Sequence, residues 1–313
     1  MYSILAILVV LLGTKGFDKV EDILAVIKTA AIIIFIIMAF GALFGWFTGT
    51  NVKQPGIPNS LKQLFTGGWQ GFWSSLIYAF YAFGGIEVIG LMTIRLKKKE
   101  DAPKSGKLML LLLALIYIVS IGLSVTLVSV EAFDPNESPF ITALADYHLS
   151  YFKHGFNAAI IIAGFSAMTA TLFGVMTLLV TLAKDGDAPQ LFAKKINKFK
   201  NLPLPSLALA TVGLLASIII ALLLPEKIYE YITTAAGGIL LLYNWACIIA
   251  SSLKLQKQRN RLHSFVGLFG GVLLLGITVI GTLAEKSIRP GFYISILLLI
   301  IIGIVTIYRN KKS

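Results

Sequence analysis

Residues 108–130 read LMLLLLALIYIVSIGLSVTLVSV and contain no charged side chain. About 20 consecutive apolar residues in an α-helix are enough to cross the hydrocarbon core of a bilayer. Including this segment, apolar blocks of that length occur at roughly 24–47, 72–93, 107–130, 155–183, 204–224, 229–252, 263–284 and 290–308. The sequence therefore predicts an all-α integral membrane protein, a polytopic bundle of about eight spanning helices.

The composition agrees with a membrane protein. Hydrophobic residues make up 57% of the 313-residue chain and charged residues 13%, whereas a soluble domain carries about 25% charged residues. Residues 1–13 are apolar but too short to span a bilayer unaided, and they lack the positive start and the small-residue cleavage site of a signal peptide. We therefore interpret residues 1–13 as the end of a truncated helix.

The distribution of basic residues predicts the orientation. If the connection at 14–23 is cytoplasmic, most of the 27 Lys and Arg residues fall on that side of the membrane. They lie in the segments 15–28, 95–107, 184–200, 254–261 and 309–312. The positive-inside rule then predicts a cytoplasmic C-terminus, and we expect a multi-pass protein of the cell membrane. The net charge of +12 is thus an orientation signal, and it does not indicate a nucleic-acid partner.

Several kinds of chemistry are excluded by the sequence. It has no P-loop for ATP hydrolysis, and its single cysteine, Cys247, and three scattered histidines form no metal-binding spacing. An ion channel would need a filter or a ring of charged residues, and the sequence shows neither. An intramembrane enzyme would need paired ionisable groups, for which only Glu87 and Lys28 qualify. We expect no enzyme, metal or cofactor, and any transport to be driven by an ion gradient.

Glu87 is the only acidic residue that these boundaries place deep within a span, and it follows the glycine pair Gly84 and Gly85. A charge at membrane depth costs at least about 2.5 kcal/mol and so calls for a reason. Adjacent glycines weaken a helix, and broken helices of this type form substrate sites near the bilayer midplane in transporters. Close helix packing is the alternative use of such glycines. The carboxylate favours a functional break of the helix 72–93 at Phe83 to Gly85.

Lys28 is a basic residue about one turn into the span 24–47. A long side chain at that depth can snorkel to the cytoplasmic interface without any further role. If it faces the bundle instead, its ammonium could occupy the place of a bound sodium ion or carry a proton. Both interpretations of Lys28 stay open at this point.

A stripe of polar and aromatic residues lies on one face of the span 155–183. It consists of Ser166, Thr169, Phe173 and Thr177. Such a stripe either hydrogen-bonds a neighbouring helix or lines a pathway, and Ser166 and Thr169 are the candidates for pathway-lining residues.

The connection at 131–154 is expected to contain a short helix. Ser138 offers an N-cap and Pro139 a helix-starting residue ahead of the sequence FITALADYHL. We expect this helix to lie on the surface.

Three stretches resemble the amino acid–polyamine–organocation superfamily, the amino-acid permeases. FYAFGGIE at 80–87 is similar to the broken sixth helix of that family, and KKKEDAPKSGK at 97–107 to the charged loop that follows it. LAKDGDAP at 182–189 is similar to the end of the eighth helix, with NLPLP at 201–205 opening the ninth. Arg95 departs from the family, which commonly has a glutamate near that point. With the pattern of spans, the resemblance covers nearly the whole chain.

The resemblance implies an inverted-repeat transporter fold, in which two five-helix repeats are followed by two extra helices. It implies a single membrane domain over 1–313 that begins in the fourth helix and lacks most of the first repeat. The remnant of that repeat would be 1–47, the second repeat 72–252 and the two extra helices 263–308. Helices one to three, including the broken first helix that binds the substrate carboxylate in the family, would then precede residue 1.

The resemblance also implies which residues bind the substrate. Backbone acceptors for the substrate amine would come from Tyr81, Ala82 and Gly84, with Phe83 beside them and Gly85 in the same break. Which amino acid is carried depends partly on pocket walls that the absent helices supply.

Ion coupling would depend on two of the residues already described. By the resemblance, Lys28 falls where some proton-coupled members carry a lysine in place of sodium. Glu87 is the second candidate for ion coupling, because of its depth in the span.

We expect a secondary transporter of amino acids in the cell membrane, a symporter that is coupled to protons or sodium ions and surrounded by lipid. Without the carboxylate-binding donors of helices one to three, we expect the 313 residues alone to take up no amino acid. The alternative is a helical membrane scaffold or accessory subunit with no transport of its own.

Overall fold

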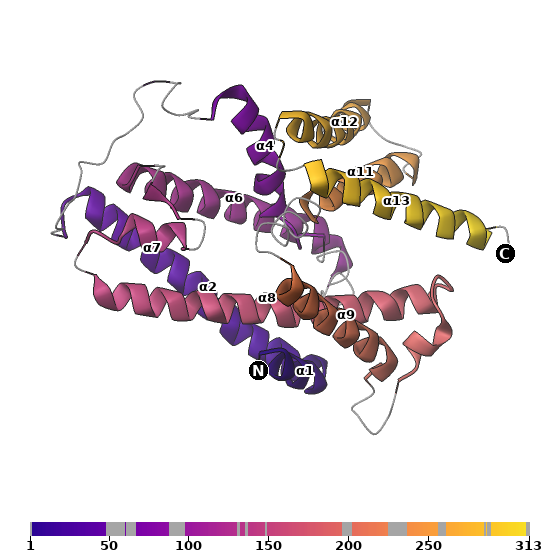
Figure 1. Ribbon diagram of the computed structural model, residues 1–313. Coiled ribbons are helices and arrows are strands. Elements are labelled where there is room, and N and C mark those ends of the chain that lie inside the picture. Colours follow the sequence, from indigo (N-terminus) through magenta and orange to yellow (C-terminus); the bar gives the residue numbers. More distant parts are fainter. Residues whose placement is uncertain are drawn as a thin grey trace. The chain divides into compact units, whose positions relative to one another are not determined.

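The computed structural model describes residues 2–47, 60, 67–87, 98–129, 132–134, 137–147, 149–195, 202–224, 237–255, 261–284, 286 and 289–310. The regular elements in these ranges are helices (Figure 1). Seven of them are long and apolar enough to cross a bilayer: α2 (Thr14–Leu43), α6 (Ala102–Leu127), α8 (Ser150–Lys184), α9 (Leu204–Leu223), α11 (Gly237–Leu255), α12 (Arg261–Ala284) and α13 (Arg289–Asn310). The predicted all-α, multi-span architecture is confirmed.

The chain divides into two compact units. The first unit comprises Met1–Pro58 and Glu87–Ile218, and the second comprises Asn59–Ile86 and Ile219–Ser313. Most of the polar residues singled out in the sequence lie in the first unit, whereas the glycine pair lies in the second.

The N-terminal region of the first unit is helical almost throughout. α1 (Tyr2–Leu11) has ten residues, too few to span a bilayer. Gly13, with φ of 81°, turns the chain from α1 into α2, a conformation that glycine adopts without a Cβ clash. The loop predicted at 14–23 is therefore wrong, since α2 begins at Thr14. The charges of that stretch lie on an amphipathic helix, in which Phe17 is buried and Lys15 and Asp18 are exposed.

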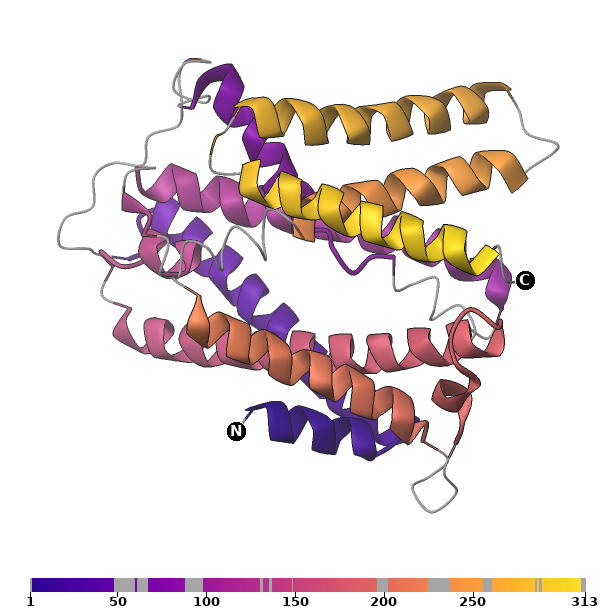
Figure 2. The same cartoon turned by 45° about the vertical axis from the view of Figure 1, so that its right-hand side comes forward.

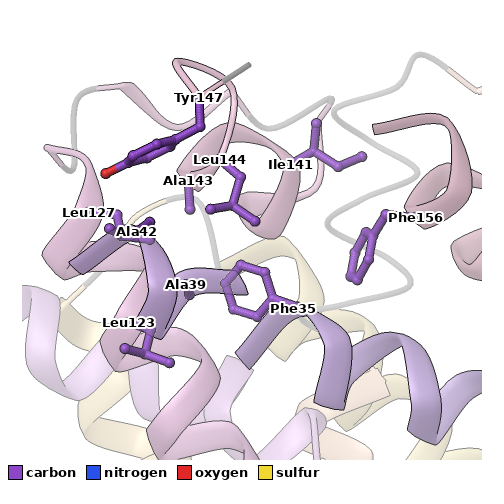
Figure 3. Packing of buried hydrophobic residues seen from close by; sticks show 10 residues of the cluster. All are labelled: Phe35, Ala39, Ala42, Leu123, Leu127, Ile141, Ala143, Leu144, Tyr147 and Phe156. Carbon is purple, nitrogen blue, oxygen red and sulfur yellow. The ribbon is translucent and has the colours of Figure 1, made fainter. Parts of the chain in front are cut away.

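A hydrophobic cluster joins α2 to α6 and to the segment that leads into α8. Phe35 of α2 is fully buried, with its ring centroid 4.6 Å from that of Phe140 and 6.2 Å from that of Phe156. The buried members of the cluster are Phe35, Ala39, Ala42, Leu123, Leu127, Ile141, Ala143, Leu144, Tyr147 and Phe156 (Figure 3).

The short helix α7 (Pro139–Ala143) belongs to this cluster. It begins at Pro139 with Ser138 in the N-cap position, as the sequence predicts. Its location on the surface is the wrong part of the prediction, because Ile141 and Ala143 are only 2% and 1% exposed. The helix also ends earlier than expected, after five residues.

The second unit packs α4 (Gly68–Tyr81) against α11 and α12, with α13 beside α11 (Figure 2). Ile77 of α4 is fully buried at the point where the three helices meet. Gly238 of α11 and Gly281 of α12 both face it, and a Cβ added to Gly281 would lie 2.8 Å from Ile77 Cδ1. Small residues at such positions let helix backbones approach closely.

Candidate functional site

Lys28 of α2 is bound to α8 in the first unit. Its Nζ donates a hydrogen bond to Ser166 Oγ, at 2.7 Å. The two helices cross in Figure 1, and Ser166 and Thr169 are both fully buried on α8. The stripe on α8 therefore does bond a neighbouring helix, which was one of its two interpretations.

The hydrogen bonds continue from Ser166 to a carboxylate. The Ser166 hydroxyl donates to Glu21 Oε2 at 2.7 Å, and the Thr169 hydroxyl lies 3.0 Å from Glu21 Oε1. Because Glu21 and Lys28 are seven residues apart, two helical turns put them on one face of α2. Ser166 thus accepts from an ammonium group and donates to a carboxylate at the same time.

The contact of Lys28 with α8 bears on its two interpretations, because the side chain faces the neighbouring helix. Lys28 follows the first residue of α2, Thr14, by 14 positions, which is about 21 Å at 1.5 Å per residue. Lysine snorkelling relies on a side chain that reaches the interface from near a helix end. Here the side chain is half-buried in the middle of a 30-residue helix and is bonded to the neighbouring helix.

Glu21 is the site residue that the sequence analysis missed. The predicted loop at 14–23 placed it outside the membrane-spanning segments, so Glu87 was named as the only deep acidic residue. The spacing of seven residues between Glu21 and Lys28 is the signal that could have identified it. It would have required recognising that the charged stretch continues the helix of Lys28.

A cavity of about 730 Å³ adjoins Lys28. Its polar lining consists of Lys28, Glu137, Ser138 and Asn157, and the remaining lining is apolar. The carboxylate of Glu137 is held by the ammonium of Lys153 at 2.9 Å. The hydrogen bond from Lys153 lowers the pKa of Glu137 from its ordinary value of 4.5. An anion therefore lines this cavity at neutral pH, in the same cavity as the ammonium of Lys28.

On the other side of Glu21, toward the start of α2, the α2–α8 contact is aromatic. Phe17 of α2 stacks on Phe173 of α8, and both belong to a buried cluster with Leu172 and Met176. Ala6 and Val10 of α1 and Leu207 and Ala210 of α9 complete the cluster. The polar residues at the crossing are thus bordered by tightly packed apolar side chains.

The predicted break of the helix 72–93 falls only partly within the described residues. α4 ends at Tyr81, and the amide groups of Phe83, Gly84 and Ile86 bond to carbonyls three residues back. Gly85 has φ of 100°, which an L side chain rarely adopts. Residues 88–93 lie outside the described residues, so the structure describes the end of this helix and not its continuation.

The predicted site residues fall into two sets. Lys28, Ser166 and Thr169 are brought together in the first unit through Glu21. Tyr81, Ala82, Phe83, Gly84 and Gly85 lie together at the end of α4 in the second unit. Glu87 is half-buried in the turn that follows them.

The sequence profile of the amino acid permease family matches residues 2–312. The chain belongs to the amino acid permease family. A relative described as an uncharacterized transporter, YcgH of Bacillus subtilis, is 49% identical over the whole chain, which covers 69% of that relative. This membership confirms the resemblance seen in the sequence. It also shows that the permease is a transporter rather than an enzyme.

Two more distant relatives of the permease are named for the substrates that they transport. The aromatic amino acid transport protein AroP of Corynebacterium glutamicum is 26% identical over 88% of the chain and 63% of its own length. A D-serine/D-alanine/glycine transporter of Escherichia coli is 26% identical over 83% of the chain and 56% of its own length. Together with the seven spanning helices, they support a multi-pass membrane protein that transports amino acids.

Proposed function

We propose that this permease is a secondary active transporter of amino acids in the cell membrane and that protons drive it through Lys28. The observation that carries the proposal is the position of the ammonium group, which lies at the middle of α2, adjoins a cavity and is bonded to Ser166 at 2.7 Å. A charged group within a membrane-spanning segment is costly, which makes Lys28 a candidate for a role in transport. A titratable ammonium there can bind and release a proton without any metal ion.

The substrate amine is proposed to bind at the end of α4. Where the i to i−4 pattern stops, a backbone carbonyl has two lone pairs and can accept a further hydrogen bond from an ammonium group. We assign this role to Tyr81, Ala82 and Gly84, with Phe83 beside them and Gly85 providing the conformation of the break. The named relatives transport amino acids with neutral side chains, which favours a substrate of that class.

Glu87 is proposed as a second group for ion coupling. It follows the break directly and is half-buried. A carboxylate there can take a proton or attract a cation. Ser166 and Thr169 remain candidates for residues along the pathway.

Uptake of radiolabelled neutral amino acids into liposomes tests the function. The permease is assayed both as the 313-residue chain and fused behind the corresponding N-terminal part of the B. subtilis relative. We expect uptake by the fused form under an inward proton gradient, and its loss on addition of a protonophore. Lys28→Ala and Glu87→Ala should each reduce it. Absence of uptake in both forms would contradict the proposal and favour a scaffold or accessory subunit.

The orientation is tested separately, in a background in which Cys247 is replaced by serine. We propose that the C-terminus and the residues around Lys99 and Lys195 are cytoplasmic, because of the basic asymmetry. Cysteines introduced at Lys99 and Lys195 should resist an impermeant thiol reagent in intact cells, whereas one at Asn136 should react. Labelling at Lys99 would reverse the orientation.

A further inference from the structure

We propose that Glu21 is a second proton-binding residue, which exchanges a proton with Lys28 through the hydroxyl group of Ser166. This inference rests on the proposed proton coupling and adds a residue to it. The distances carry it: Lys28 Nζ to Ser166 Oγ and Ser166 Oγ to Glu21 Oε2 are each 2.7 Å. Both are short bonds to a charged group, and Ser166 is fully buried between them.

The transfer requires no movement of heavy atoms. Lys28 gives a proton to Ser166 Oγ while the serine hydroxyl gives its own proton to Glu21 Oε2. The ammonium group becomes a neutral amine, the carboxylate becomes a carboxylic acid, and Ser166 is again a hydroxyl. A charged pair is thereby converted into a neutral pair. In a low-dielectric setting the neutral pair avoids the cost of keeping two charges away from water.

Thr169 lets Glu21 change its charge without leaving a polar group unsatisfied. Its hydroxyl lies 3.0 Å from Glu21 Oε1, 2.8 Å from the carbonyl oxygen of Phe165 and 2.9 Å from that of Ser166. One hydrogen cannot serve all three acceptors at full strength. When Glu21 is a carboxylate, the hydroxyl can donate to it, and when Glu21 is protonated, the hydroxyl can donate within its own helix.

Other ionisable groups near this pair are few. α2 is packed against α1, α6 and α8, and against the segment of α7, whose Glu137 lines the same cavity as Lys28 and is paired with Lys153. α8 carries no ionisable side chain between His154 and Lys184, and the charged residues that precede Glu21 on α2 are exposed. The remaining groups on these helices are Tyr2 of α1, Lys104, Lys107 and Tyr117 of α6, Tyr151 and Lys153 of α8, and Lys15, Asp18, Lys19 and Asp22 of α2.

The two ends of the pair have different surroundings. Lys28 adjoins the cavity of about 730 Å³, whereas Glu21 lies between Lys28 and the stacked rings of Phe17 and Phe173 along α2. Lys28 is thus the group placed to receive a proton from the cavity. Glu21 is the group placed to hold the proton on the side of Ser166 that faces Phe17 and Phe173.

The first test needs no transport. The purified chain is reconstituted into lipid with 13C-labelled glutamate, and infrared spectra are recorded at neutral pH. In Lys28→Met the half-buried carboxylate loses its cationic partner, so Glu21 should take up a proton and the C=O band of a protonated carboxyl group should appear. The double variant Lys28→Met/Glu21→Gln should lack that band. A Lys28→Met spectrum without the band overturns the proposal.

Ser166 is tested in the same spectra. Adding Ser166→Ala to Lys28→Met should shift the band, because the acid loses its hydroxyl partner. Thr177→Val is the matched control, since the Thr177 hydroxyl donates only within α8, to the Phe173 carbonyl at 2.8 Å. An equal shift in both variants would assign the effect to the helix and not to the bridge.

The second test separates this inference from the proposed function. Proton-driven net uptake needs a proton to leave Lys28, whereas exchange of labelled for unlabelled substrate does not. Glu21→Gln and Ser166→Ala should lower the ratio of net uptake to exchange by roughly 100-fold, and Ser166→Thr should restore it. Equal losses in both modes would make Glu21 a structural residue. If the unmodified protein shows neither net uptake nor exchange while the carboxyl band is present in Lys28→Met, the proposed transport function fails. The proton exchange between Lys28 and Glu21 still stands in that case.

Discussion

Phe17 of α2 and Phe173 of α8 stack with their ring centroids 4.2 Å apart and their planes inclined by 12°. They are 5% and 2% exposed, so little solvent or lipid reaches either ring. The pair connects the predicted loop at 14–23 to α8, the longest helix of the described residues, with 35 residues. Its contribution to stability is directly measurable.

We predict that Phe17→Ala destabilises the first unit by about 3 kcal/mol, because a cavity replaces a fully packed ring. The measurement is the free energy of unfolding in mixed micelles with increasing denaturing detergent. Phe44→Ala is the control, since Phe44 is 71% exposed on the same stretch of chain and should change stability by less than about 0.5 kcal/mol. Equal losses in the two variants would show that the stack is not what stabilises this region.

Gly281→Ala should weaken the second unit. Its Cβ would lie 2.8 Å from Ile77 Cδ1 and 3.0 Å from the carbonyl oxygen of Trp73, and the carbonyl cannot rotate away. Overpacking of this kind costs about 1–3 kcal/mol. Gly276→Ala on the same helix is the matched control, because nothing lies within 4 Å of its Cβ position. The midpoint of thermal unfolding should fall for Gly281→Ala and stay level or rise for Gly276→Ala.

The ion pair between Glu137 and Lys153 should stabilise the chain in a pH-dependent way. Folding lowers the pKa of Glu137, chiefly through the hydrogen bond from Lys153, so this stabilisation is complete above the ordinary value of 4.5. It is lost as the pH falls below 4.5 through the lowered pKa.

Lys153→Met should therefore destabilise the protein at pH 7 and lose that effect in acid. Because the two side chains are 53% and 34% exposed, we expect no more than about 0.5 kcal/mol. Thermal unfolding of both proteins at neutral and acid pH measures it. A difference that stays constant across this range would mean that the pair is not responsible.

Gly85→Ala should impair the proposed substrate site while leaving the fold in place. At φ of 100° an alanine strains the backbone by about 1–3 kcal/mol, although nothing lies within 4 Å of its Cβ position. The turn should then adopt another conformation, and the fused form should show a raised KM for amino-acid uptake. Gly71→Ala in α4 has equal space and no positive φ, so it should behave like the unmodified protein.

The sequence was sufficient for the all-α, multi-span architecture, because the seven long helices described are longer and more apolar than a soluble alternative allows. The end of α4 at Tyr81 was also predictable, since two adjacent glycines weaken a helix and are visible in the local sequence. The start of α2 was not predictable from composition. Charged residues at a helix end and in a connection look alike, and only the packing of Phe17 against Phe173 distinguishes them.

The candidate site was predicted in part. Ser166 and Lys28 were each identified on their own helix, because polar residues stand out within apolar spans. Their contact was not predictable, since a single sequence does not specify which helices cross or at what height. Glu21 was missed for a related reason, because its role depends on where α2 crosses α8 and on where α2 begins.

Lys28 and Ser166 meet near the midpoint of both helices: Lys28 is 15 residues from the end of α2 at Leu43, and Ser166 is 18 from the end of α8 at Lys184. Two helices that cross near their midpoints can change their crossing angle by rotating about the point of contact. A change in tilt of about 10° would move the ends of α8 by roughly 4–5 Å at 1.5 Å per residue, but Ser166 hardly at all. The bond between Lys28 and Ser166 would lie at the centre of such a motion. Glu21, about 10 Å along α2 from Lys28, would be carried roughly 2 Å by the same motion, and Phe17, about 16 Å from Lys28, roughly 3 Å. The stack of Phe17 on Phe173 and the contact of Phe35 with Phe156, on the two sides of the crossing, therefore oppose such a motion.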